Sequence, residues 1–427
     1  MKNIFISMIL FAFLTSNTYS QERVITTDLP AINEELINLT PEQIEQYYLN
    51  QEKQIKEYIA NNKATKGTVY QIPVVFHILT DNASHESNIS DCIIQNQIDI
   101  LNAAFRKKSG TRYYNTNPVG ADTEIEFFLA CKDPNGNTTT GIDRVTTSSC
   151  NYTGSNSSTI MGVSKWATNK YLNIWVVKSV PSGTRAQAWW GNTTNIGIIV
   201  HYSYVGSKES GCPNISYIDA TTWDAYDLGT TLIHETGHFF NLLHTFENCT
   251  TGDYCGDTPA VTGNPEPYCN TNNETKGLCS GTTRRMYENY MDYTDDACMN
   301  IFTANQATRM RSYITSTSNY TNMVSTANIS AVGCSSLGIN NIDATNNSLN
   351  IYPNPNNGQF KIELNLENYN NANLNVYDVY GKLVISESYN NIKSINKMYN
   401  FNNLQSGIYF IKVISNDKVY SEKFIIN

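Results

Sequence analysis

Charged side chains are scarce in this 427-residue chain, since Asp, Glu, Lys and Arg together make up only 16% of it. Lys and Arg number 29 against 38 Asp and Glu, and the net charge is −9. General nucleic-acid-binding proteins need a basic surface, so this balance argues against that class. The apolar fraction of 40% is enough for folded cores and argues against a disordered chain.

Long apolar runs are missing beyond the N-terminus. Ile4–Leu14 form a short apolar run after Lys2, and the small residues Thr18 and Ser20 follow. This order is typical of a secretory signal peptide, and the run is short against the roughly 20 residues of a membrane span. We therefore expect a signal peptide at residues 1–20, no transmembrane segment in the mature protein, and a secreted or cell-surface location that permits disulfides.

Cysteine is absent from residues 21–66, a polar segment that we interpret as a propeptide. A helix is predicted to begin at Thr40-Pro41, because Thr is a capping residue and Pro is favoured at the first helical position. The alternative is a plain helical extension of the next domain. If the segment blocks a metal site, it must do so without a thiolate, through a carboxylate such as Asp28 or through steric cover.

Residues 67–320 combine strand and helix patterns, which predicts an α+β (mixed α/β) domain. The predicted strands are 70–79, 171–177, 184–190 and 196–202, and the predicted helices are 90–105 and 228–240.

The last part of the chain has only strand patterns. Residues 321–348 are rich in Ser, Thr and Asn and are predicted to form a linker. Residues 349–427 carry short strands separated by turns, which predicts an all-β sandwich domain. The predicted strands here are 360–364, 374–380, 408–413 and 423–426.

Histidine is rare, with six in the chain, and three of the six fall within eleven residues. His234 and His238 are four residues apart, so on a helix they lie on one face and can bind one Zn²⁺. Glu235 is adjacent to the first histidine, where its carboxylate can reach a water on the metal without being a ligand.

His244 can join the same ion only if the helix ends before it. A continuous helix would place it about 9 Å beyond His238 along the axis and turned away. The helix must therefore stop near Asn241, and Asn is the usual second choice after Gly for a left-handed turn. A glutamate as third ligand, such as Glu266 or Glu288, is the alternative geometry.

The resulting pattern, HExxHxxNxxH, resembles the metzincin zinc endopeptidases, which have Gly where this chain has Asn241. Metzincins also have a downstream Met-turn, and Asn289–Tyr293 fits it. The resemblance implies that Met291 forms an apolar floor beneath the zinc. It also implies that Tyr293 reaches toward the reacting carbonyl.

Within metzincins, the chain resembles the pappalysin family over roughly residues 68–320. The segments that carry the resemblance are Leu232–His238, His244–Phe246, Gly252-Asp253, Asp257–Pro259 and Met291–Cys298.

The resemblance also implies two disulfide bonds and a second metal ion. It implies disulfides Cys249–Cys279 and Cys269–Cys298, and the other six cysteines allow 15 pairings. It further implies structural Ca²⁺ held by Asp253, Asp257 and Thr258, for which an ordinary polar turn is the alternative.

These features predict a zinc-dependent metalloendopeptidase that acts on extracellular proteins or peptides. Glu235 would take a proton from the zinc-bound water, and Tyr293 would help stabilise the oxyanion. Substrate would lie extended along Thr184–Trp190 as an added strand. Asp295 and Asp296 would favour Arg or Lys after the scissile bond, as in pappalysins.

A non-catalytic adhesion protein with a relic zinc site is the alternative function. The presence of Glu235 with all three histidines favours the enzyme.

The C-terminal segment resembles the sorting domain of the type IX secretion system. The carrying residues are Tyr352–Pro355, Tyr380–Val384, Leu404–Val413 and Lys423–Ile426. This resemblance implies the secretion machinery as a partner. A carbohydrate-binding sandwich is the alternative, but all five Trp lie before residue 224.

Overall fold

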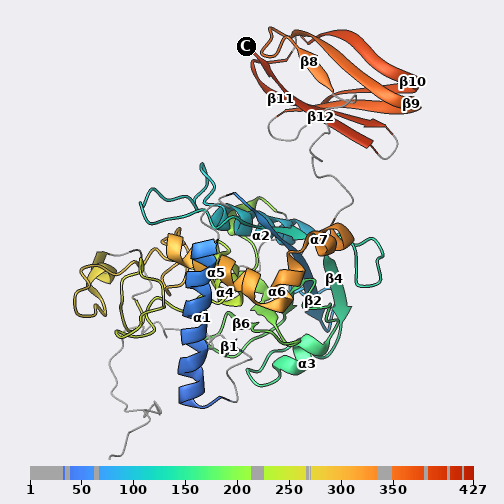
Figure 1. Ribbon diagram of the computed structural model, residues 1–427. Helices are drawn as coiled ribbons and strands as arrows, with labels where there is room; N and C mark the ends of the chain where they lie inside the picture. The colour runs from blue at the N-terminus through green and yellow to red at the C-terminus, as the bar shows by residue number, and fades with distance from the viewer. Residues whose placement is uncertain are drawn as a thin grey trace, which may run out of the picture. The chain divides into compact units, whose positions relative to one another are not determined.

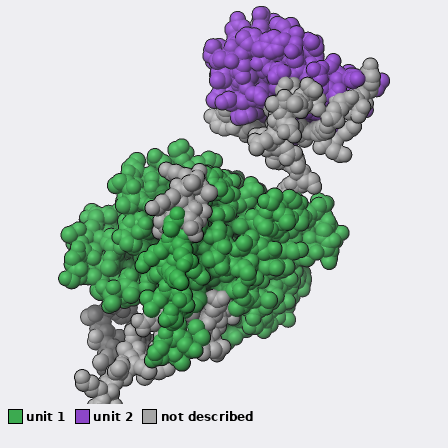
Figure 2. Space-filling view, in the orientation of Figure 1, with its two compact units in different colours: residues 1–333 green, residues 334–427 purple. Residues whose placement is uncertain are grey.

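The computed structural model has two compact units, residues 1–333 and residues 334–427 (Figure 2). The predicted signal peptide, Asp28 and Glu266 lie outside the described residues. Among the described helices, none combines the length and hydrophobicity that a membrane crossing requires. The described residues are 32–33, 39–61, 67–212, 226–265, 269, 271–333, 349–378, 383–401, 404–415 and 418–427.

Unit 1 is built on a seven-stranded sheet in the order β1-β6-β7-β5-β2-β3, with β4 also paired to β2. Every described pair is parallel except β6 with β7. β3 and β4 follow one another along the same edge of β2. The strands are β1 Ile32–Asn33, β2 Tyr70–Thr80, β3 Ile125–Leu129, β4 Ile142–Thr146, β5 Leu172–Val177, β6 Ala186–Trp190 and β7 Gly197–His201.

The central strands are buried on both faces, as expected for parallel sheets covered on both sides. Along β5, Ile174 and Val176 join the core shared with α2 (Asp91–Phe105) and α4 (Thr230–Phe239). Trp175 belongs to a separate cluster with α3 (Ser157–Gly162) on the other face. The predicted strands and helices of this mixed domain are confirmed, while β3 and β4 were missed.

In addition to α2, α3 and α4, the described part of unit 1 contains four helices. One of them, α1, packs against another, α5 (Figure 1). Tyr320 and Met323 of α6 are fully buried. The Ser- and Asn-rich composition had suggested a linker from residue 321, but these two apolar side chains anchor the segment to the core. The helices are α1 Pro41–Asn61, α5 Ala304–Ser316, α6 Ser318–Met323 and α7 Thr326–Val332.

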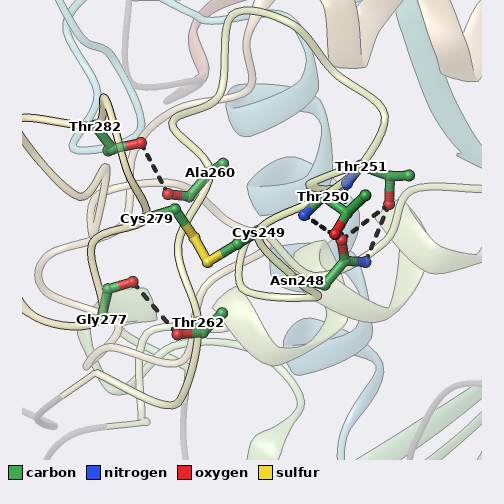
Figure 3. The surroundings of a disulfide bond; sticks show 9 residues. All are labelled: Asn248, Cys249, Thr250, Thr251, Ala260, Thr262, Gly277, Cys279 and Thr282. Atoms are coloured by element: carbon green, nitrogen blue, oxygen red, sulfur yellow. Dashed lines mark hydrogen bonds between the residues drawn. A yellow bond between two sulfur atoms is a disulfide. The ribbon is translucent and has the colours of Figure 1, made fainter.

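Disulfides staple the loop-rich segment between α4 and α5. The structure joins Cys249 to Cys279 and Cys269 to Cys298, the two pairs that the family resemblance implies. Beside the first bond, the Asn248 side chain accepts hydrogen bonds from the backbone N–H groups of Thr250 and Thr251 (Figure 3). These local bonds order a segment that has few large apolar side chains.

The other described cysteines divide into bonded and free. Cys92 at the start of α2 is joined to Cys212, and Cys131 is also disulfide-bonded. Cys150 and Cys255 are buried free thiols.

Unit 2 is all-β, as predicted, and every named pair of its strands is antiparallel. β9 is one long strand, where two were expected: its first half pairs with β8 and its second half with β11. Asn356 donates its N–H to the Ile425 carbonyl, which links the first turn to the last strand. The strands are β8 Asn350–Tyr352, β9 Gln359–Asp378, β10 Leu383–Asn400, β11 Gly407–Ser415 and β12 Lys418–Ile426.

Candidate active site

Three imidazoles converge at the end of α4. The Nε2 atom of His238 lies 3.0 Å from the Nε2 of His234 and 3.0 Å from the Nε2 of His244. The helix ends at Phe239, and Asn241 has a φ of +70°, the left-handed turn predicted from the sequence. This turn brings His244 back to the face that carries the other two rings.

The proton on each of the first two rings can be assigned from its neighbour. The Nδ1 of His234 lies 2.7 Å from the Tyr290 carbonyl, and the Nδ1 of His238 lies 2.8 Å from the Leu242 carbonyl. A carbonyl only accepts, so both Nδ1 atoms are protonated and both Nε2 lone pairs face the shared centre. Burial lowers the pKa of both histidines well below the usual range. Neutral imidazoles whose lone pairs converge suit a Zn²⁺ ion, and the backbone carbonyls orient them for it.

Met291, the residue of the predicted Met-turn, packs against α4. Met291 is fully buried, and a Cβ atom placed on Gly237 of α4 would stand only 2.4 Å from its Sδ. Asn289 shapes the turn, because its Oδ1 accepts from the Met291 N–H at 2.9 Å. Two amide hydrogen bonds to Gln306 of α5 fix the Asn289 side chain in turn.

Tyr293 points its hydroxyl into the cluster, 2.9 Å from the Nε2 of His244. The residue before it, Asp292, forms a bidentate ion pair with Arg285 at 2.8 and 2.6 Å, and neither side chain is exposed. Asp292 also accepts from the Tyr293 N–H at 2.8 Å. The sequence did not reveal Arg285, because its neighbour Arg284 is an equally plausible partner and lies at the surface.

Glu235 is buried on α4 and faces a pocket beside the histidines. Asp296 lies at the same pocket and accepts from the N–H groups of Leu228 and Thr230, at 2.8 and 3.3 Å, at the start of α4. Desolvation raises the pKa of Asp296. The pocket is lined by Arg185, Tyr226, Thr230, Thr231, His234, Glu235, Asp292, Tyr293, Thr294, Asp296 and Met299.

The strand expected to receive substrate is β6, and its two edges are both paired in the described structure. One edge pairs with β7, and the other pairs in parallel with β1, where Ile32 lies opposite Trp189. The Trp190 ring stacks on the His238 ring with centroids 6.0 Å apart, so the last residue of β6 lies beside the histidines.

The residues proposed for calcium are only partly brought together. Asp253 is buried and its Oδ1 accepts from the Thr258 hydroxyl at 2.5 Å. Asp257 instead accepts from the Thr303 hydroxyl at 2.6 Å and from the Asn305 N–H at 2.9 Å, so both its oxygens cap α5.

The remaining histidines and the alternative ligand lie elsewhere. Buried His77 bonds to Asn173 at 2.9 Å, and Glu288 pairs with Arg284. Across the described ranges, the group of metal-binding side chains that converges is His234, His238 and His244.

Comparisons with known proteins show the family to which the chain belongs. Residues 154–315 match the family model for pregnancy-associated plasma protein-A, and residues 350–427 match the secretion system C-terminal sorting domain. A promirolysin mutant of Tannerella forsythia is 31% identical, with a TM-score of 0.56, over 70% of this chain and 96% of that chain. The chain belongs to the pappalysin family of metalloendopeptidases.

An extracellular enzyme is among the other relatives of this pappalysin. An extracellular metalloprotease of Sordaria macrospora is 29% identical over 283 residues, which cover 62% of this chain and 84% of that protein. Mature mirolysin of Tannerella forsythia, in complex with a cleaved peptide, is 32% identical with a TM-score of 0.51, over 62% of this chain and 97% of that one. The pappalysin described here is a secreted zinc metalloendopeptidase with a C-terminal sorting domain.

Proposed function

We propose that this pappalysin cleaves peptide bonds of extracellular proteins with Glu235 as general base and Tyr293 as a stabiliser of the oxyanion. The observation that carries the proposal is the convergence of three imidazole Nε2 atoms, with the Tyr293 hydroxyl 2.9 Å from the Nε2 of His244. Glu235 follows the first of these histidines and lines the adjoining pocket.

Zinc, when bound by His234, His238 and His244, lowers the pKa of water toward about 7 and polarises a carbonyl. The buried carboxylate of Glu235 accepts the proton of the attacking water and returns it to the leaving amine. The Tyr293 hydroxyl donates to the developing oxyanion, and the Asp292 carboxylate holds its backbone in place.

Casein digestion by the secreted, processed protein tests the proposal. Wild-type protein should digest casein, lose activity with a chelator and regain it with Zn²⁺. Glu235→Ala should retain zinc and lose cleavage. The matched control is Glu126→Gln, a partly exposed glutamate paired with Arg106, which should cleave at the wild-type rate. Full activity in Glu235→Ala would overturn the role of Glu235.

Residues 21–66 are proposed to keep the enzyme latent. β1 occupies the edge of β6 where substrate would add as a strand. The promirolysin match also covers more of this chain, 70%, than the mature mirolysin match, 62%. N-terminal sequencing and mass measurement of secreted material should show a chain that begins near residue 67. Activity in the uncleaved precursor equal to that of the processed form would contradict latency.

The pocket lined by Asp296 is proposed to receive the residue after the scissile bond and to favour Arg or Lys. Asp292 contributes little to this preference because Arg285 neutralises it. Arg185 lines the same pocket, so the basic preference should be weak. A peptide library should show enrichment of basic residues at this position, and Arg185→Met should increase it. A profile without basic enrichment in either protein would contradict the proposal.

Two further roles are proposed for parts outside the zinc site. Asp253 has a buried Oδ2 with no hydrogen-bond partner among the described residues, which supports calcium binding there. Calcium should raise the unfolding temperature of the wild type but not of Asp253→Asn. The type IX secretion machinery is the proposed partner of unit 2, and removal of residues 349–427 should leave the protein inside the cell.

A further inference from the structure

A helix of the proposed propeptide touches the turn that places the third histidine. α1 lies against α5 (Figure 1). Its residues Tyr48, Gln51 and Glu52 are three and four positions apart, so they share one face of the helix. Tyr48 stacks on Tyr254 with ring centroids 5.1 Å apart, which seats this face on the domain.

Arg309 of α5 connects that face to the zinc-motif turn. Its Nε donates to the Asn241 carbonyl at 2.8 Å, and its Nη1 donates to Glu52 of α1 at 2.7 Å. The Arg309 side chain is only 1% exposed. Because the guanidinium is a rigid planar fork, these two bonds together set its orientation.

Gln51 reaches the same turn from α1. Its Oε1 accepts from the Asn241 side-chain amide at 3.3 Å. Asn241 is the left-handed residue of the turn, and it lies three residues before His244. The position of His244 therefore depends on a turn that is held on one side by Arg309 and on the other by α1.

We propose that Arg309 is a positioning residue for the zinc site and that Glu52 sets its orientation, so that α1 stabilises the placement of His244. This inference rests on the proposed function, since α1 belongs to the segment proposed as the propeptide. Without Glu52 the buried guanidinium loses its counter-charge, which is strongly unfavourable. Arg309 then turns away, the Asn241 carbonyl loses its donor, and His244 becomes the weakest of the three ligands.

The rate of zinc release from the full-length chain to a chelator tests this coupling. Glu52→Gln keeps the size of the side chain and removes the charge, while Arg309→Lys keeps the charge and removes the fork. Both should release zinc about tenfold faster or more, the usual effect of losing a group that orients a metal ligand. The double variant should release zinc no faster than Arg309→Lys alone, because both changes break one linkage.

Two matched controls lie on the same helices. Glu57 of α1 is 60% exposed and pairs only loosely with Lys53, at 3.8 Å. Arg311 of α5 also contacts α1, through Tyr58. Its other hydrogen bonds run to the backbone carbonyls of Thr68, Thr123 and Glu124 rather than to the zinc-motif turn. Glu57→Gln and Arg311→Lys should release zinc at the wild-type rate.

Thermal unfolding of each variant shows whether faster zinc release reflects loss of the whole fold. If Arg309→Lys does not fold, Glu52→Gln is the deciding variant. Equal release rates in wild type and Glu52→Gln would overturn the inference, as would faster release from the controls. A wild-type chain that holds no zinc would overturn the proposed function, and this inference with it. Equal release rates from zinc-loaded proteins would overturn the inference alone.

Discussion

The two compact units bury different kinds of side chain. Among the described residues, unit 2 buries a nearly purely apolar core, with Asn356 and Ser415 as its buried polar residues. Unit 1 buries the complete Arg285–Asp292 ion pair and also Arg309. Apolar packing is sufficient to form a stable unit, whereas buried charges hold specific atoms in place at a cost in desolvation. The difference therefore marks unit 1 as the unit built to position atoms.

The largest expected effect comes from breaking the buried pair. Arg285→Met leaves the Asp292 charge without a partner and should lower the free energy of unfolding of unit 1 by about 3–5 kcal/mol. All five Trp precede residue 224, so urea unfolding followed by Trp fluorescence reports on unit 1.

The adjacent arginine and unit 2 provide the controls for that measurement. Arg284 is 39% exposed, and Arg284→Met should cost no more than about 1 kcal/mol. Phe424→Ala removes a fully buried ring from unit 2, at a cost of about 3–5 kcal/mol to that unit. A change in the Trp transition with Phe424→Ala would contradict the separation of the units.

The contrast between apolar packing and buried charge also explains which features the sequence predicts and which it does not. The spacing of His234, His238 and His244 identified the metal site, and the need for a left-handed residue identified Asn241. Arg309 was not predicted, because its partners Glu52 and Asn241 are distant from it in the chain. Arg285 was not predicted, because the sequence does not distinguish it from the adjacent Arg284. The polar strand β10 and the helix α6 were missed for a related reason: few apolar residues anchor each of them.

An intermediate effect is expected where α4 meets the Met-turn. Gly237→Ala places a Cβ 2.4 Å from the Met291 Sδ and forces the two elements apart. Overpacking of this kind costs about 1–3 kcal/mol. It should also lower casein cleavage if Met291 has its predicted role as the floor of the metal site. Activity and Trp-monitored stability equal to wild type would show that the close contact is not required.

A smaller effect is expected at the turn of the zinc motif. Asn241 has a φ of +70°, so Asn241→Ala should cost about 1–2 kcal/mol in backbone strain, whereas Asn241→Gly should avoid that strain. Equal stability of the two variants would contradict the importance of the left-handed turn. The comparison should be made in the processed enzyme, which lacks Gln51 as a partner.

The smallest effects concern two carboxyl groups of unit 1 whose pKa values shift in opposite directions. Burial raises the pKa of Asp296, so its contribution to stability is present at acid pH and is lost as the pH rises from about 4. A hydrogen bond to His77 lowers the pKa of Asp143, so its contribution is present above about pH 4 and is lost as the pH falls.

Urea unfolding between pH 3 and pH 7 measures both contributions. Asp296→Asn should be relatively more stable at pH 7 than at pH 3 when compared with wild type, and Asp143→Asn should be relatively less stable. The same sign in both variants would contradict these pKa directions.

X-ray absorption at the zinc edge of the full-length Glu235→Ala protein tests the central claim most directly. We expect one zinc ion per chain with three imidazole nitrogens at about 2.0–2.1 Å. A spectrum with two imidazoles, or with sulfur ligands, or a chain that contains no zinc would contradict the convergence of His234, His238 and His244 on one metal.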